Sequence, residues 1–331
     1  MAGTLADRMW RVSAPESIEE DLAALWRELG RADARIARAV MSNLIVFRDR
    51  MAPFDAEPSA IVEGLPLEDV ASRHPSRMIV LEHCYDHKPG APFAAGVGIV
   101  TFGPPHARYG VEQIVVRSAC PDAPLLSILR RFVRGDLPTT VWWTEDLSQA
   151  PPLGPFLAVG RQLLYDSRRW RDVRLGVAAL APIVGNHGVD LADLNWRRLA
   201  ALRQALVHAR GPLTSPAWRR VSARIVSARG EDALAWLCAG WLRSVQRDSS
   251  APLPAVEIGA LSDALLRVTV DGVTATLTSH SVEVAGMSAP PMIVGVRVET
   301  EADAIAAELR TLSRDAALVA TLEVLIDTFG R

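Results

Sequence analysis

Residues 138–148 read P-T-T-V-W-W-T-E-D-L-S, a β-branched run that ends in two adjacent tryptophans. On a strand, successive side chains point to opposite faces of the sheet, so Trp142 and Trp143 face opposite ways. One indole can fill a core, and the other must then meet a second layer of structure, a binding partner or water. Tryptophan is common both in packed layers and at interfaces, so the motif alone leaves these readings open.

Farther along the chain, residues 160–174 read G-R-Q-L-L-Y-D-S-R-R-W-R-D-V-R. Five arginines lie around Trp170 with only two acids, and Trp and Arg are the residues most enriched at binding hot spots. The stretch contains no nucleophile–base pair and no metal cluster, so it predicts recognition of a partner. The partner-binding residues that we predict are Trp143, Arg168, Arg169 and Trp170, joined by Trp196 and Arg197. The alternative is that Trp170 anchors a linker between domains and the arginines are solvated.

The first 185 residues predict an α/β domain. The pattern indicates a largely parallel sheet with helices on both faces and an antiparallel edge. A capping box, Ser17-Ile18-Glu19-Glu20, opens an amphipathic helix whose apolar face continues to Val40. Further helices are expected near 61–72 and 125–134. The expected strands are 44–47, 78–81, 98–102, 113–117, 140–143 and 163–165.

Residues 186–331 predict an α+β C-terminal domain with an antiparallel sheet. Asp271-Gly272 lies between two alternating runs, which is a strong hairpin signal. The other strands are expected at 221–228, 281–284 and 293–298. Helices are expected at 190–209, 231–246, 301–313 and 316–329.

Bulk composition narrows the function classes. The 331 residues are 49% hydrophobic and 22% charged with a net charge of −2, which gives no reason to expect nucleic acid or an anionic membrane as a partner. Lys88 is the only lysine and lies in a polar turn, which argues against lysine catalysis. Cys84, Cys120 and Cys238 form no C-x-x-C pair, as expected for free thiols in the cytoplasm. The first residues do not form a signal peptide, and the longest apolar stretch, Leu175 to Gly185, is too short to span a bilayer.

A search for chemistry predicts no catalytic residue, no cofactor and no metal. The chain has no phosphate-binding G-x-x-x-x-G-K-[ST] loop, and Gly96-Val97-Gly98 lacks the third glycine of a dinucleotide fingerprint. The first strand runs into Arg48-Asp49-Arg50 without a glycine loop. Hydrolase and zinc-protease motifs are absent. His83 and His87, with Cys84 or Asp86, are metal-ligand types, but no second ligand group accompanies them and a solvated turn explains them.

Several blocks in order resemble the OpcA-type glucose-6-phosphate dehydrogenase assembly proteins. The blocks are N-L-I-V at 43–46, H-P-S-R-M-I-V-L at 74–81, D-L-P at 136–138 through Trp142-Trp143, Y-D-S at 165–167, D-L-N-W-R-R-L at 193–199 and A-G-W-L at 239–242. The resemblance implies a non-enzymatic protein that binds glucose-6-phosphate dehydrogenase and favours its active oligomer as an allosteric activator. Its role would be to support NADPH production by the oxidative pentose phosphate pathway. It transfers no catalytic residue.

Part of that family is linked to redox control through cysteines near the C-terminus, and this chain has none after Cys238, so that regulation is not transferred. Two other functions remain open on the residues alone. One is an enzyme or sensor that binds a sugar phosphate through Arg168, Arg169 and Arg171, although such a site should pair with a helix N-terminus or a backbone nest. The other is a structural scaffold.

Overall fold

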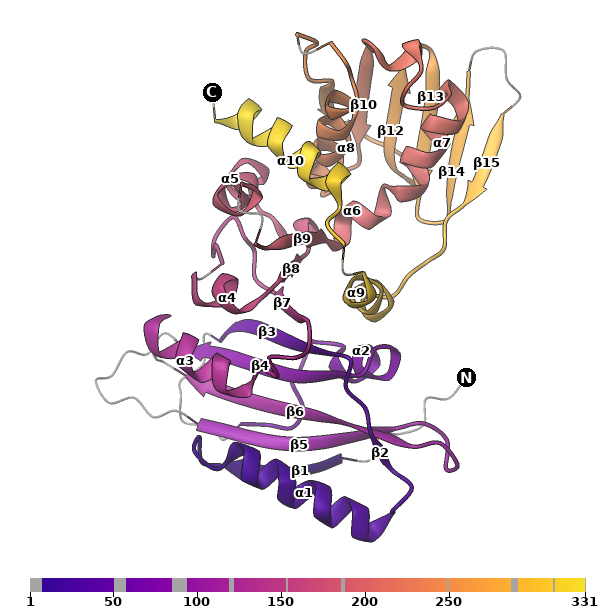
Figure 1. Ribbon diagram of the computed structural model, residues 1–331. Coiled ribbons are helices and arrows are strands. Elements are labelled where there is room, and N and C mark those ends of the chain that lie inside the picture. The colour runs from indigo at the N-terminus through magenta and orange to yellow at the C-terminus, as the bar shows by residue number, and fades with distance from the viewer. Residues whose placement is uncertain are drawn as a thin grey trace. The chain divides into compact units, whose positions relative to one another are not determined.

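The computed structural model describes residues 8–50, 58–84, 94–118, 122–152, 154–185, 188–248, 250–286, 291–311 and 313–330 (Figure 1). The chain divides into two compact units. Unit 1 comprises Met1–Glu145, Pro152–Leu164 and Glu301–Leu312, and unit 2 comprises Asp146–Pro151, Tyr165–Thr300 and Ser313–Arg331. The chain therefore passes between the units more than once. The domain boundary at residue 185 stays a prediction.

Unit 1 is built on a largely parallel sheet, which confirms the predicted fold class for this half. Its strands are β1 (Arg8–Ser13), β2 (Ala37–Arg38), β3 (Ser42–Arg50), β4 (Ser76–Cys84), β5 (Ala94–Phe102), β6 (Tyr109–Ser118), β7 (Thr139–Trp143) and β8 (Gln162–Tyr165). The order of these strands is β1-β5-β6-β4-β3-β7-β8, β2 pairs with β6, and the strand order of the sheet continues from β8 to β9 (Asp190–Asp193). Strand β5 runs in the opposite direction to its two neighbours, β1 and β6, and the pairs β2–β6, β6–β4, β4–β3, β3–β7 and β7–β8 are parallel.

The strand order is that of a doubly wound sheet. From β3 the chain moves outward through β4 to β6, then returns to the other side of β3 with β7 and β8. The direction of winding therefore reverses between β3 and β7, at the point where open α/β sheets commonly bind ligands. The β4 strand is buried along its whole length, as expected for a parallel strand covered on both faces.

The helices of unit 1 are α1 (Ile18–Ala32), α2 (Leu67–Arg73), α3 (Asp122–Phe132), α4 (Gly154–Val159) and α9 (Glu301–Arg310). Helix α1 is amphipathic as predicted, but the capping box is wrong because the Ser17 side chain makes no cap hydrogen bond. The helix also ends at Ala32, before the predicted apolar face does, because the Asp33 carboxylate accepts the N–H of Arg35 and turns the chain. Helix α9 packs on α2, where Arg73 donates to Asp303 at 2.8 Å.

Unit 2 contains the second sheet, which confirms the predicted α+β character. Its strands are β10 (Ala223–Ser227), β11 (Ala255–Ile258), β12 (Ala264–Val270), β13 (Val273–Thr278), β14 (Ser281–Ala285) and β15 (Met292–Gly295), in the order β11-β10-β12-β13-β14-β15. All neighbours are antiparallel except β10 and β11. The predicted hairpin is confirmed: Asp271 and Gly272 have φ of 44° and 85°, and two positive values define a type I′ turn.

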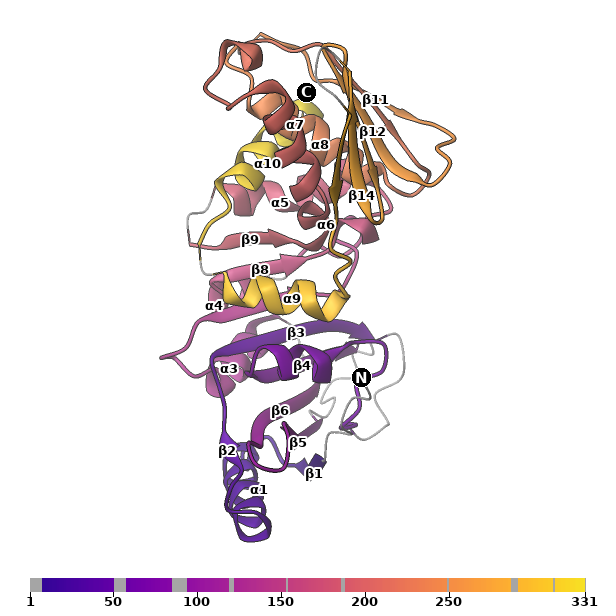
Figure 2. The ribbon, with the colours of Figure 1, turned by 90° about the vertical axis from the view of Figure 1, so that its right-hand side faces the viewer.

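The remaining elements of unit 2 are β9 (Asp190–Asp193), η1 (Ser167–Arg169), α5 (Val173–Val184), α6 (Leu194–Arg198), α7 (Ala200–Arg210), η2 (Pro216–Trp218), α8 (Asp232–Ser244) and α10 (Ala316–Phe329). Helices α7 and α8 pack against the second sheet, and α10 packs against α8 and α5 (Figure 2). The predicted helix 190–209 is wrong at its start. Residues 190–193 form β9, because the Asp193 carboxylate caps α6 by accepting the N–H of Asn195.

Candidate functional site

The predicted partner-binding residues divide between the two units. Trp143 ends β7 in unit 1, whereas the other five lie in unit 2 on two short segments. Arg168, Arg169 and Trp170 belong to the turn around η1, and Trp196 and Arg197 belong to α6. These two segments pack directly against each other. The structure thus brings together five of the six residues, although 26 or more positions separate the two segments in the sequence.

All three predicted tryptophans are buried. Trp143 is 1% exposed and stacks on Phe47 at 3.9 Å between ring centroids, with the edge of Phe156 against it. Trp142 is also 1% exposed, so both indoles of the opening motif pack between layers. Trp170 is 8% exposed and stacks on Tyr165. Within this chain the indoles therefore organise the core beneath the surface, and a role in binding a partner stays a prediction.

A buried polar cluster joins the turn around η1 to α6. We call it the carboxylate corner, and its members are Asp166, Ser167, Asp193 and Asn195. The Asp193 Oδ1 accepts the backbone N–H of Ser167 at 3.0 Å and that of Asn195 at 2.9 Å. The Asn195 amide donates to the Ser167 hydroxyl at 3.0 Å. The Asp193 carboxylate thus binds the backbone of both the turn around η1 and the first residues of α6, which holds these two segments together.

Burial makes this corner electrostatically unusual. The pKa of Asp193 is raised to about 7, first because the carboxyl is buried and then because the charge of Asp166 lies nearby. Burial also raises the pKa of the Tyr165 hydroxyl, with the negative charges of Asp193 and Asp315 adding to it. A carboxyl with a pKa near neutrality is often a catalytic acid, but Asp193 is only 1% exposed. A carboxyl buried this deeply can hold a proton that stabilises the fold, but it cannot contact a substrate.

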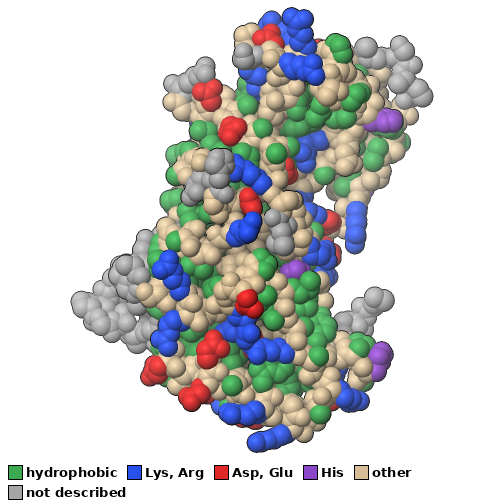
Figure 3. Space-filling model, viewed as in Figure 1, with side chains coloured by type: hydrophobic (Ala, Val, Ile, Leu, Met, Phe, Trp, Pro, Cys, Tyr) green, Lys and Arg blue, Asp and Glu red, His purple; other side chains and the backbone are tan. Residues whose placement is uncertain are grey.

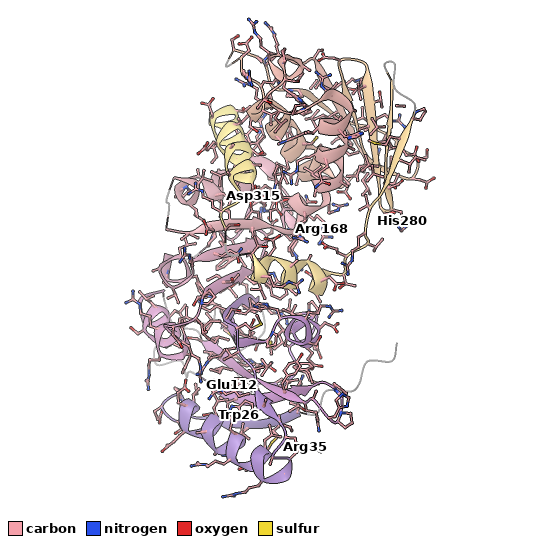
Figure 4. The ribbon with its side chains drawn as sticks, turned by 45° about the vertical axis from the view of Figure 1, so that its right-hand side comes forward. Trp26, Arg35, Glu112, Arg168, His280 and Asp315 are labelled. Carbon is pink, nitrogen blue, oxygen red and sulfur yellow. The ribbon has the colours of Figure 1, made fainter. Side chains whose placement is uncertain are left out.

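Trp196 and Asp315 form a second buried contact beneath α6. The Trp196 indole N–H donates to Asp315 Oδ2 at 2.8 Å (Asp315 is labelled in Figure 4). The other oxygen of Asp315 caps α10 by accepting the N–H groups of Ala317 and Leu318. The Arg203 guanidinium lies 3.8 Å over the Trp196 ring, where a cation is attracted by the aromatic face. One side chain therefore couples the position of α6 to the start of α10.

The arginines of this region lie at the surface, and several already have acidic partners. Arg168, with 44% of its side chain exposed, donates to Asp166 at 2.8 and 2.5 Å. Arg197 makes a forked contact with Glu299 at 2.9 and 3.0 Å. Arg169, Arg171 and Arg174 are also exposed. We call the four exposed arginines Arg168, Arg169, Arg171 and Arg174 the basic segment.

The turn around η1 does not form a phosphate-binding nest. The backbone N–H of Ser167 donates to Asp193, and that of Arg168 donates to Asp166. Both donors therefore face carboxylates, which would repel a phosphate at this position. These two backbone N–H groups therefore do not support the alternative that the turn binds a sugar phosphate.

The carboxyl ends of β3 and β7 carry acids. The backbone N–H of Asp49, near the end of β3, donates to Glu145 at 3.0 Å, and His83 lies 3.4 Å from Asp49. At this switch point the Asp49 N–H therefore already binds a carboxylate, whereas a dinucleotide phosphate is bound by backbone donors. No group of three or more His, Cys, Asp or Glu suited to a metal occurs among the described residues, and Asp86 and His87 lie outside them.

Sequence reasoning missed two buried charge contacts between β4 and β6 in unit 1. One joins Arg117 to Glu82 at 2.6 Å, and the other is a network around Glu112. Glu112 accepts the Trp26 indole N–H at 2.8 Å and Arg77 Nη1 at 3.0 Å, and it also pairs with Arg38 (Trp26 and Glu112 are labelled in Figure 4). Arg77 lies on β4 and Glu112 on β6, two neighbouring parallel strands that each carry an apolar run. The sequence signal for such contacts was a charged residue next to the apolar run of an expected strand, such as Arg77 before Met78. The network ties α1 and β2 to the sheet.

On the face shown in Figure 3, basic and acidic side chains are intermingled, in keeping with the small net charge. No helix among the described residues is long and apolar enough to cross a membrane.

Comparisons with protein families match most of the chain. Residues 67–181 match the model described as the glucose-6-phosphate dehydrogenase subunit N-terminal domain, and residues 189–322 match the corresponding C-terminal domain. The chain is also 32% identical over 115 residues to the putative OxPP cycle protein OpcA of Nostoc punctiforme. That match spans 33% of this chain and only 24% of the length of its relative.

Solved structures give weaker similarities. A putative oxidoreductase of Bacillus subtilis has a TM-score of 0.41 at 10% identity, covering 86% of this chain and 94% of that one. An NAD-binding oxidoreductase of Klebsiella pneumoniae has a TM-score of 0.42 at 12% identity, covering 87% and 95%. Similarities at this level carry no inference about the chemistry of the present chain.

Proposed function

Because the chain belongs to the OpcA-type family of glucose-6-phosphate dehydrogenase assembly proteins, we propose that it binds glucose-6-phosphate dehydrogenase and favours that enzyme's active oligomer. The proposal includes no catalysis by the chain itself. The observation that carries it is the match of both family domains, in order, over residues 67–181 and 189–322.

An activator of this kind acts by differential affinity. It shifts the dehydrogenase towards its active oligomer only if it binds that form more tightly than the inactive one, and ~1.4 kcal/mol of difference shifts the ratio tenfold. The expected outcome is therefore a change in oligomer distribution and in activity at a fixed dehydrogenase concentration. In the cell this would raise NADPH production by the oxidative pentose phosphate pathway.

We place the docking surface on the basic segment of unit 2. The Tyr165–Trp170 stack and the carboxylate corner hold the backbone of the turn around η1, from which Arg168 and Arg169 project. Forked guanidinium groups match carboxylates and carbonyl oxygens of a partner. Arg197, which is half-buried and paired with Glu299, would extend the surface from α6. The buried Trp143, Trp170 and Trp196 would contribute by supporting the fold.

The test uses the purified full-length chain and the dehydrogenase encoded in the same genome. Light scattering coupled to gel filtration measures complex formation and oligomer size, and NADPH formation measures activity. We expect co-elution, a change in the oligomer distribution of the dehydrogenase and a higher rate of NADPH formation. Failure to co-elute at micromolar concentrations would overturn the proposal. NADPH formation from glucose 6-phosphate by the chain alone would overturn its non-enzymatic part.

Two matched variants test the docking surface. Arg169→Ala/Arg171→Ala should weaken dehydrogenase binding by roughly 1–3 kcal/mol, or about five- to 150-fold, without lowering the melting temperature. The control is Arg219→Ala/Arg220→Ala, an exposed tandem arginine pair elsewhere in unit 2, which should bind normally. Arg168→Ala is unsuitable as the sole variant because it leaves the buried Asp166 without its guanidinium partner. Equal binding by both double variants would rule out the basic segment as the docking surface.

A further inference from the structure

The second sheet of unit 2 has one face covered by helices and one face open. Helices α7 and α8 pack on the sheet from one side (Figure 2). Along β12 and β13 every second residue is buried, and the residues between them are exposed or half-exposed. The same alternation continues in β14. The sheet therefore presents an open face of side chains, many of them threonines, away from α7 and α8.

One row of residues crosses five of the six strands of this open face, from β10 to the edge strand β15. On the other edge strand, β11, the row continues with Glu257, which pairs with Arg224 of β10. The strand registers place Thr276 of β13 between Arg267 of β12 and Glu283 of β14. Beyond Arg267 lies Val226 of β10, and beyond Glu283 lies Ile293 of the edge strand β15. Arg267 and Glu283 are exposed, and Ile293 is 71% exposed. Thr276 is thus the centre of the row. The residues one strand away on either side, Arg267 and Glu283, carry opposite charges. The residues two strands away on either side, Val226 and Ile293, are apolar.

We propose that this open face is a homodimer interface with a two-fold axis that runs parallel to the strands over Thr276. Rotation by 180° about that axis turns a second copy face to face with the first. Arg267 of each copy then lies over Glu283 of the other, and Val226 lies over Ile293. A two-fold interface requires a surface that is complementary to itself, and this row meets the requirement at five successive strands.

The dimensions and the neighbouring row agree with this arrangement. Strands lie ~4.8 Å apart and sheets pack ~10 Å face to face, so the side chains of Arg267 and Glu283 can meet across the interface. In the next row, Thr269, Thr274 and Ala285 occupy the three central strands, and Arg224 of β10 lies beyond Thr269, where it pairs with Glu257. The axis places Thr274 over its own copy and Thr269 over Ala285, so the three central strands bring no charged residues together in this row. The second copy would also cover Ile293, whose exposure on an edge strand otherwise favours non-specific association.

Charge reversal tests the interface, with the full-length chain studied by sedimentation equilibrium. The wild type should be a dimer at micromolar concentrations. Arg267→Glu alone or Glu283→Arg alone creates two like-charge contacts per dimer and should raise the dimer Kd at least tenfold. The combined variant restores opposite charges across the axis and should recover the wild-type Kd to within about threefold. Arg35→Glu, at an arginine of unit 1 whose side chain is 69% exposed, is the control and should leave the Kd unchanged.

Three results would overturn the proposal. The first is a monomeric wild type at ~100 μM, a concentration at which a specific dimer should form. The second is a combined variant that remains as weak as the single ones, because only self-association across this axis predicts the rescue. The third is a loss of dehydrogenase binding in the single variants without any change in self-association, which would assign the face to that partner. Unchanged thermal melting of every variant confirms that the fold is intact.

Discussion

Asp315 holds two elements of unit 2 in place, and its substitution gives a measurable prediction. One carboxylate oxygen caps α10, and the other accepts the Trp196 indole N–H at 2.8 Å. Removing the cap costs ~1 kcal/mol. Leaving the indole N–H of Trp196, which is 3% exposed, without an acceptor costs about 1–3 kcal/mol more. Asp315→Ala should therefore lower the free energy of unfolding by roughly 2–4 kcal/mol, or about 4–16 °C in melting temperature.

Two further variants separate these contributions. Asp315→Asn keeps an oxygen for the cap but turns an N–H₂ group towards the indole, so it should cost about 1–3 kcal/mol. Trp196→Phe removes the indole donor itself. In that background Asp315→Ala should cost only the cap, ~1 kcal/mol. The coupling between the two positions should thus be about 1–3 kcal/mol.

The assay is urea unfolding followed by circular dichroism, with calorimetry as a second measurement. If Asp315→Ala costs the same in the wild type and in Trp196→Phe, the hydrogen bond contributes nothing and the reasoning fails. A loss below ~0.5 kcal/mol for Asp315→Ala alone, the size typical of ordinary surface substitutions, would also refute it.

Three other predictions follow from burial. Because the folded-state pKa of Asp193 is raised from 3.8 to about 7, the folded protein binds the proton more tightly, so stability should fall as pH rises from about 4 to 7. Asp193→Asn should lack that slope in melting curves taken across this range. The pKa of the Cys238 thiol is raised to about 12 by burial, so iodoacetamide at pH 8 should label it only after unfolding, as read by mass spectrometry; rapid labelling of the native protein would contradict this. Gly176→Ala would place a Cβ 2.4 Å from the Trp170 ring and should cost about 1–3 kcal/mol, whereas Gly185→Ala, which meets nothing within 4 Å, should be neutral.

Local features of the chain were predictable because they depend on neighbouring residues. The Asp271-Gly272 turn needs two positive φ angles, and those residue types adopt them. The apolar run of β3 and the alternation of β12 and β13 identified strands, since side-chain period follows backbone geometry. The fold class of both halves followed from the order of such elements. The high density of arginines at 161–174 is likewise visible in the sequence without any structure.

Long-range packing decided the rest. Whether Trp143 and Trp196 are exposed depends on Phe47 and Asp315, which lie 96 and 119 positions away. The return of α9 to unit 1 rests on contacts such as Arg73 with Asp303, 230 residues apart. The carboxylate corner exists only because β9 brings Asp193 beside Ser167. A sequence pattern shows on which face of a helix or strand the apolar groups lie. Whether that face is buried, and what its polar groups bind, depends on which distant segment packs against it. The tertiary fold decides which segment that is.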